Sequence, residues 1–156
     1  MTASIVVSRA DFADPALATF LQDHLDDMET TSPPESRHAL DLAGLQQPHV
    51  RLWTAKDAGV IVGTVALATL EPSHDELKSM RTDPLRRGQG IGALLLEAAL
   101  ADARSRGVQR VSLETGSMNF FAPARRLYER AGFRPCPPFG HYTDDPNSAY
   151  FTLDLS

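Results

Sequence analysis

A glycine-rich stretch in the second half of the chain has the residue types and the spacing needed to hold a phosphate group. It runs Arg86-Arg87-Gly88-Gln89-Gly90-Ile91-Gly92-Ala93. It follows a segment over 76–82 that is typical of a strand ending at Asp83-Pro84, and it begins a helix that apolar periodicity predicts over 91–105. Alternate glycines let the backbone approach a bound group closely, while the free N–H groups and positive dipole end of a helix favour an anion. We therefore expect a phosphate or pyrophosphate here.

The same glycines also fit a dinucleotide-binding protein. Gly88-x-Gly90-x-x-Ala93 matches a loose form of that fingerprint, and Glu114 lies at a suitable distance along the chain for a ribose contact. However, Pro84 and two arginines separate the strand end from Gly88, and too few residues follow for a second mononucleotide-binding half. An NAD(P)-binding oxidoreductase is therefore the weaker alternative.

Three segments, in order along the chain, resemble the GNAT superfamily of N-acetyltransferases. Arg87-x-x-Gly90-x-Gly92 resembles its acyl-CoA pyrophosphate loop, and the run over 76–80 before Asp83-Pro84 looks like its fourth strand. Leu127-Tyr128-Glu129-Arg130-Ala131-Gly132-Phe133 looks like its Leu-Tyr-x-x-x-Gly-Phe segment. The resemblance implies an α/β (α+β) fold: a mixed, mainly antiparallel sheet of six to seven strands, flanked by about four helices. That sheet is splayed between its fourth and fifth strands, where the cofactor enters.

The resemblance also implies acetyl-CoA as the co-substrate, without a metal. Cofactor contacts are expected from the end of the fourth strand, from the glycine-rich stretch and from one asparagine: Met80, Arg81, Thr82, Arg87, Gly88, Gln89, Gly90, Ile91, Gly92, Ala93 and Asn119. Ile91 and Ala93 would act through their backbone, and an amide near Met80 to Thr82 would contact the oxyanion. The family often has an asparagine seven residues before its tyrosine, where this chain has Phe121. Asn119, two residues earlier, is the alternative.

Acyl transfer to an amine also needs an acid for the leaving thiolate and a base for the ammonium. The resemblance assigns the acid to Tyr128, because a phenol with a pKa of about 10 is protonated at neutral pH. Glu76 is the first choice for the base, with Glu114, His74 and His141 behind it. Each of these could equally be a satisfied structural or surface residue. Covalent transfer through Cys136 is an alternative mechanism.

The acceptor is expected to bind near the connection between the first two helices. Ser32-Pro33-Pro34-Glu35 has the form of a capping box and predicts the start of a second helix. In the resembled family this region shapes the acceptor pocket, so the expected contacts are Glu35, Ser36, Arg37 and His38, with Glu114 from the fifth strand. A simple capped surface helix is the alternative interpretation.

Periodicity and turn residues predict the elements that position these groups. Strands are expected over 4–8, 50–55, 60–67, 110–115 and 149–153, with a turn at 56–59 and further helices over 15–29 and 122–131. In the central helix one face is expected to be buried: Ile91, Leu94, Leu95, Ala98 and Ala101. His24 on the first helix is expected to be solvated, and a position facing a substrate is the alternative.

Composition limits the class of protein. With 156 residues, 42% hydrophobic and 22% charged, the chain predicts a single globular domain over 1–156. The net charge of −5 argues against a nucleic-acid partner and suits a cationic acceptor. Cys136 is the one cysteine, which excludes an internal disulfide and suits the cytoplasm. No apolar run is long enough to cross a membrane, and the five histidines lack metal-ligand spacing.

The sequence thus predicts a cytoplasmic N-acetyltransferase. It would move an acetyl group from acetyl-CoA to a primary amine of a small-molecule or amino-acid-like acceptor by direct attack in a ternary complex. An acyl-CoA-binding module without turnover, used for sensing, is the alternative from another class. A homodimer is expected by analogy with the resembled family only.

Overall fold

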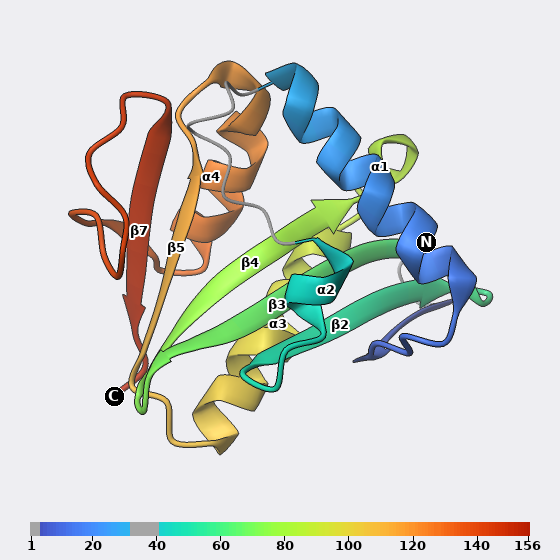
Figure 1. Ribbon diagram of the computed structural model, residues 1–156, viewed down its shortest axis with the longest axis horizontal. Helices are drawn as coiled ribbons and strands as arrows, with labels where there is room; N and C mark the ends of the chain where they lie inside the picture. Colours follow the sequence, from blue (N-terminus) through green and yellow to red (C-terminus); the bar gives the residue numbers. More distant parts are fainter. Residues whose placement is uncertain (1–3, 32–40) are drawn as a thin grey trace.

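The computed structural model, which describes residues 4–31 and 41–156, is built on a mixed β-sheet with helices on both faces (Figure 1). Within these residues the strands are β1 (Ile5–Arg9), β2 (Val50–Asp57), β3 (Val60–Glu71), β4 (His74–Thr82), β5 (Arg110–Gly116), β6 (Arg134–Pro135) and β7 (Ser148–Asp154). They form one seven-stranded sheet in the order β1-β2-β3-β4-β5-β7-β6. All neighbours are antiparallel except β4 and β5, which are parallel. The predicted mixed, mainly antiparallel sheet is confirmed.

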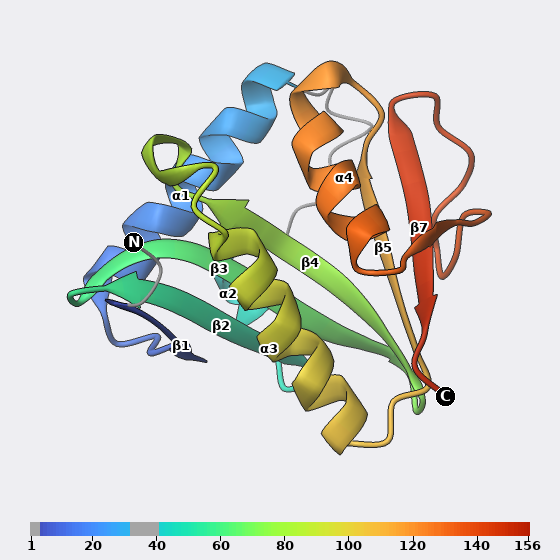
Figure 2. The same ribbon diagram turned by 180° about the vertical axis from the view of Figure 1, so that it is seen from behind.

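The helices cover the two faces of this sheet in pairs. Helices α1 (Pro15–Thr31) and α2 (Leu42–Leu45) lie on one face, and α3 (Ile91–Ser105) and α4 (Ala122–Arg130) lie on the other, as Figure 1 and Figure 2 show from opposite sides. Two short 3-10 turns, η3 (Pro84–Arg86) and η4 (Asn119–Phe121), precede α3 and α4. The sheet thus lies between the two helix pairs, with β4 and β5 near its middle.

Each face of the sheet has its own apolar core. Below α3 and α4, Leu95 packs in one cluster with Val65 and Leu113, all at most 1% exposed. Below α1, Leu17 and Leu52 belong to a second cluster. The two clusters alternate along β2, because successive strand residues point to opposite faces. Burial of one such leucine stabilises the fold by about 1.5–3 kcal/mol.

Two details of the predicted helices differ from the structure. The buried residues of α3 are Ile91, Leu95, Leu96, Ala99, Leu100 and Ala103. Of the predicted face, Ile91 and Leu95 are therefore confirmed, whereas Leu94 and Ala98 are only half-buried and the prediction is wrong for the exposed Ala101. Apolar residues surround much of this helix, and sequence spacing alone did not identify the face that meets the sheet. Helix α2 begins after Asp41, whose carboxylate accepts from the Gly44 N–H at 2.8 Å. The predicted capping box at 32–35 lies outside the described residues.

The parallel pairing of β4 with β5 covers only part of either strand. It runs from His74 opposite Arg110 to Leu77 opposite Leu113. Beyond this point β4 continues to Thr82 and β5 to Gly116 without pairing to each other. The two strands therefore separate and form a notch in the middle of the sheet, where the sequence predicted the splay.

A β-bulge on β4 begins two residues beyond Leu77, the last residue that pairs with β5. The register against β3 shifts between Thr64 and Ala66, so that Ser79 and Met80 together lie opposite Val65. Ser79 has the left-handed φ of 54°, and its carbonyl accepts a hydrogen bond from the Thr64 hydroxyl at 2.9 Å. The extra residue re-aims the strand: Met80 packs against the α3 core, whereas Arg81 faces α1.

Candidate active site

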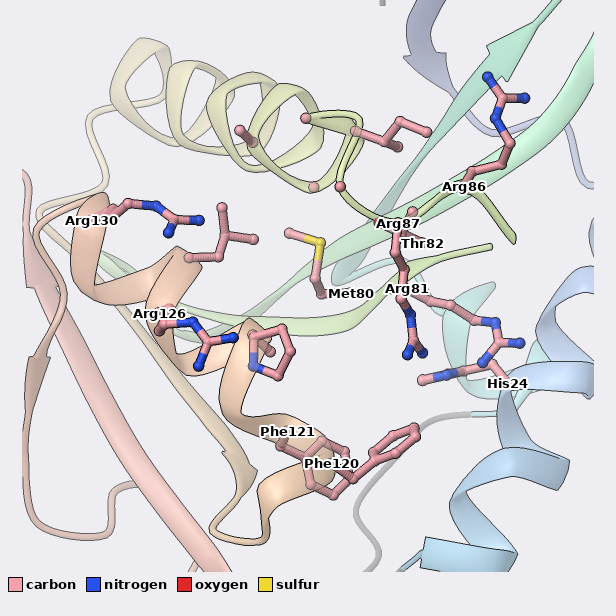
Figure 3. Close-up of a pocket in the computed structure, with 18 of the residues that line it drawn as sticks. His24, Met80, Arg81, Thr82, Arg86, Arg87, Phe120, Phe121, Arg126 and Arg130 are labelled. Carbon is pink, nitrogen blue, oxygen red and sulfur yellow. The ribbon is translucent and has the colours of Figure 1, made fainter. Parts of the chain in front are cut away.

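A cavity of about 450 Å³ lies beside the notch, between the end of β4, the start of α3 and one face of α4 (Figure 3). Its walls are His24, Asp27, Met80, Arg81, Thr82, Arg86, Arg87, Gly88, Gly90, Ile91, Gly92, Ala93, Phe120, Phe121, Pro123, Ala124, Arg126, Leu127 and Arg130. Most of the predicted cofactor contacts are among them. Gln89 and Asn119 are not.

The glycine-rich loop forms the wall of the cavity at the start of α3. Gly88 and Gly90 both have a φ of +79°, which residues with a side chain rarely adopt. Gly90 is the N-cap of α3 and provides no side-chain cap, so the first N–H groups of the helix are left for an anion. A Cβ at Gly92 would lie 3.0 Å from Leu127 Cδ2, so glycine here allows α3 and α4 to approach closely. This geometry fits a phosphate group.

Among the described residues, five arginines line the cavity, and they differ in their partners. Arg81 pairs with Asp27 of α1, and Arg86 pairs with Asp57 of β2, each at 2.6 Å. The Arg87 guanidinium lies 5.5 Å from the centre of the Phe120 ring. Gln89 accepts a hydrogen bond from Arg86 Nε at 2.9 Å, so its side chain orients the loop. The other two, Arg126 and Arg130, lie on α4, and the sequence analysis did not single them out.

His24 and Asp27 of α1 line the cavity, which differs from what was expected of this helix. His24 was predicted to be solvated, but it is half-buried on the cavity wall, close enough to Arg81 for that charge to act on it. Burial, and then the positive charge of Arg81, lower the pKa of His24 from 6.5 to about 4. His24 is therefore neutral at physiological pH. The burial depends on the approach of α1 to the end of β4, which local sequence does not reveal.

The predicted acid lies next to the cavity rather than on its wall. Tyr128 is 5% exposed and packs against Phe133, with ring centres 5.8 Å apart. Burial first, and the charge of Glu114 second, raise the pKa of the Tyr128 hydroxyl above its usual value. The same helix brings Ala124 and Leu127 to the cavity wall. Tyr128 is thus protonated at neutral pH, and its side chain lies on the side of α4 that packs into the core.

Glu76 belongs to a buried cluster on the other face of the sheet. It is 3% exposed, and its carboxylate accepts hydrogen bonds from the Tyr142 hydroxyl and, at 3.3 Å, from the Lys78 ammonium. The Lys78 ammonium also donates to the Tyr142 hydroxyl at 3.1 Å. Burial raises the pKa of Tyr142, and the charge of Glu76 raises it further. Tyr142 was missed because no local motif surrounds it.

Glu114 lies one residue beyond Leu113, the last β5 residue that pairs with β4. Burial raises the pKa of its carboxyl, while Lys78 lowers it and Glu76 raises it. The charge of Glu76 thus acts on the carboxyl of Glu114. Of the other predicted bases, His74 bonds to the Ser112 hydroxyl at 2.7 Å with its pKa lowered by burial, and His141 stacks on Tyr142.

Several other predicted residues do not join this site. Asn119 begins η4, but the cavity wall there comes from Phe120 and Phe121. Cys136 is not on the wall either, and burial raises the pKa of its thiol. The predicted acceptor contacts Glu35, Ser36, Arg37 and His38 lie outside the described residues. Across the parts of the chain that are described, no group of His, Cys, Asp or Glu side chains could hold a metal, and no helix is long and apolar enough to cross a membrane.

The splayed sheet, with an uncapped helix start beside its notch, is the fold of acyltransferases to which the chain is similar in structure and sequence. The model of the acetyltransferase (GNAT) family matches residues 17–133. The uncharacterized N-acetyltransferase YsnE of Bacillus subtilis is 41% identical over 145 residues, which cover 93% of this chain and 96% of the relative. An IAA acetyltransferase of Azospirillum brasilense is 40% identical over 124 residues, 79% of this chain and 80% of the relative.

Solved structures agree with the sequence comparisons. A Klebsiella pneumoniae protein assigned to the acyl-CoA N-acyltransferases superposes with a TM-score of 0.81 at 30% identity, covering 97% of this chain and 98% of that one. A GNAT acetyltransferase of Elizabethkingia anophelis with acetyl-CoA bound has the same fold, with a TM-score of 0.66 at 18% identity and coverage of 98% and 99%. The chain belongs to the GNAT family of acetyltransferases.

Proposed function

We propose that this chain transfers an acetyl group from acetyl-CoA to the amino group of a small-molecule or amino-acid-like acceptor, by direct attack within a ternary complex. The observation that supports this most is the cavity that joins the uncapped start of α3 to the bulged end of β4. Acetyl-CoA has a pyrophosphate and a thioester at separate points of one extended molecule. In the cavity, the start of α3 would match the pyrophosphate, and the end of β4, whose edge is not paired with β5, would match the thioester.

The loop would hold the pyrophosphate through backbone N–H groups between Gly88 and Ala93, with Arg87 adding a positive charge. The apolar side chains of Met80 and Leu127 would border the pantetheine arm. At the thioester, a backbone amide near Met80 to Thr82 would donate a hydrogen bond to the oxyanion. Because β5 has left β4 at this point, the amide would not need to give up a partner on β5.

Tyr128 would act at the leaving sulfur. Its raised pKa keeps the hydroxyl protonated at neutral pH, so that it can donate a hydrogen bond or a proton to the thiolate. Burial next to the notch would also strengthen that hydrogen bond, because the surroundings are poor in water. The core position of Tyr128 fixes the direction of the hydroxyl.

The proton of the acceptor would pass to a carboxylate at the notch. Glu76, the predicted base, is held by Tyr142 and Lys78, whereas Glu114 has the raised pKa that suits a base. Glu76→Gln and Glu114→Gln variants separate the two roles. Loss of the base should remove the acidic limb of the kcat/KM profile against pH, whereas loss of an orienting carboxylate should lower activity without moving that limb.

The proposal is tested by release of coenzyme A from acetyl-CoA across a panel of amines, amino acids, short peptides and IAA, for which one relative is named. Calorimetry with acetyl-CoA and with NAD(H) is run in parallel. Release with one class of acceptor is the expected result. Binding of acetyl-CoA without release for any acceptor would favour a sensing module, and binding of NAD(H) instead would refute the assignment of the loop.

A further inference from the structure

The positive charge around the cavity exceeds what the glycine-rich loop accounts for. Of the five lining arginines, Arg81 and Arg86 are neutralised by aspartates. In the described parts of the chain, Arg87, Arg126 and Arg130 form no ion pair. A chain with a net charge of −5 thus places three uncompensated cations on one cavity. Such a concentration favours an anionic ligand with more than one charged group.

Two of these arginines form a pair of their own on α4. Arg126 and Arg130 are four residues apart, which places them on the same side of the helix, one turn from each other. Both line the cavity, and Figure 3 shows both on its α4 wall. Like charges at this spacing repel each other and weaken a helix slightly. An anion between the two guanidinium groups would remove that repulsion.

The α4 pair is separate from the anion site of the loop. The loop offers backbone N–H groups at the start of α3, and Arg87 lies beside Phe120. Arg126 and Arg130 approach from α4 (Figure 3), and Leu127, which lies between them in the sequence, also lines the cavity. The cavity therefore has two anion-binding walls. One suits a pyrophosphate, and the other suits a terminal phosphate, whose oxygens can accept from both guanidinium forks.

We propose that Arg126 and Arg130 bind the phosphomonoester on the ribose 3′ oxygen of the acyl-CoA, and that they make this enzyme selective for CoA over dephospho-CoA. The inference rests on the proposed use of acetyl-CoA. A phosphomonoester carries close to two negative charges at neutral pH, which match two arginines. Arginine is suited to this task because its planar fork binds phosphate oxygens in pairs.

Arg125, which precedes Arg126 on the same helix, has a structural role. Arg125 donates to the carbonyls of Gly116 and Met118, at 2.6 and 3.0 Å, and ties α4 to the end of β5. Arg126 and Arg130 are exposed and make no such bonds to the described residues. Their removal should therefore change ligand binding more than folding.

The test compares CoA with dephospho-CoA, which differ only in the 3′-phosphate, by calorimetry. The proteins are the wild type, an Arg126→Gln/Arg130→Gln double variant, and an Arg104→Gln control. Arg104 is exposed on α3 and does not line the cavity. We expect the wild type and the control to bind CoA at least about tenfold tighter than dephospho-CoA. The double variant should lose this preference while its affinity for dephospho-CoA stays unchanged.

Equal affinities of the wild type for the two ligands would overturn the inference. So would an equal loss of affinity for both ligands in the double variant, because a general change in the site would then explain the result. An Arg126→Lys/Arg130→Lys variant keeps the charge and should retain part of the preference. If the wild type bound neither CoA nor dephospho-CoA, the proposed function itself would be refuted.

Discussion

Gly88→Ala separates the conformational role of the loop from its role in ligand binding. Gly88 has a φ of +79°, and a Cβ built on it would meet no protein atom within 4 Å. The methyl group would therefore project into open space, which borders the cavity. Gly107, just past the other end of α3, has a φ of +80° and equally open surroundings. Gly107→Ala is a control with the same backbone strain, far from the loop in sequence.

The expected magnitudes follow from these surroundings. Left-handed backbone costs an alanine roughly 1–2 kcal/mol, partly offset by about 0.4–1 kcal/mol from the stiffer unfolded chain. Both variants should thus lose about 1 kcal/mol of stability, which lowers Tm by about 2–4 °C in a chain of this length. Only Gly88→Ala should also weaken acetyl-CoA binding. A methyl group forced against the ligand costs about 1–3 kcal/mol, or about 5- to 150-fold in Kd.

Thermal unfolding and calorimetry with acetyl-CoA, on both variants, check this reasoning. If the Kd of Gly88→Ala equalled that of the wild type, the space beside Gly88 would not hold the ligand, and the loop assignment would be wrong. If Gly107→Ala weakened binding as much as Gly88→Ala, the effect would be general destabilisation. Loss of stability in Gly88→Ala alone would contradict the estimate of backbone strain.

Three further predictions concern other parts of the site. Tyr128→Phe should lower kcat by about a hundredfold or more, because the acid for the thiolate is lost; steady-state kinetics with an unchanged kcat would contradict this role. His24 has a pKa of about 4 when folded and 6.5 when unfolded, so the unfolded chain binds more protons between these values. Stability should fall as pH drops from 6.5 to 4, by at most about 3 kcal/mol from this group, and urea unfolding of His24→Gln should show a flatter fall. Gly63→Ala should destabilise the fold by about 1–3 kcal/mol, since its Cβ would lie 2.7 Å from Leu95 Cδ1 and 3.0 Å from the Arg81 carbonyl oxygen; urea unfolding with no loss would show that α3 can shift at little cost.

The sequence predicted what depends on local chemistry. The glycine-rich loop and the bounds of α3 follow from spacing and from helix start and stop residues, and they match the structure. The turn at 56–59 also follows from its residues, because Ala58 and Gly59 both have positive φ. Strand types followed from alternation, although their ends differ by a few residues.

What depends on packing between distant segments could not be predicted. The bulge at Ser79 and Met80 is a register shift against β3, and either strand read alone lacks it. Tyr142 reaches Glu76 across 66 residues of sequence. The arginines of α4 resemble ordinary solvated helix residues until the cavity beside them is known.

The short pairing of β4 with β5 has a practical consequence. Only four residue pairs, from His74–Arg110 to Leu77–Leu113, join the two halves of the sheet as a ladder. On the far part of β4, up to Thr82, the amides that point to the notch rather than to β3 should therefore exchange with deuterium faster than those before the bulge. A molecule lodged at the notch would shield them. Exchange at 80–82 should thus act as a built-in reporter of ligand occupancy, and it could be used to screen thioesters before any acceptor is known.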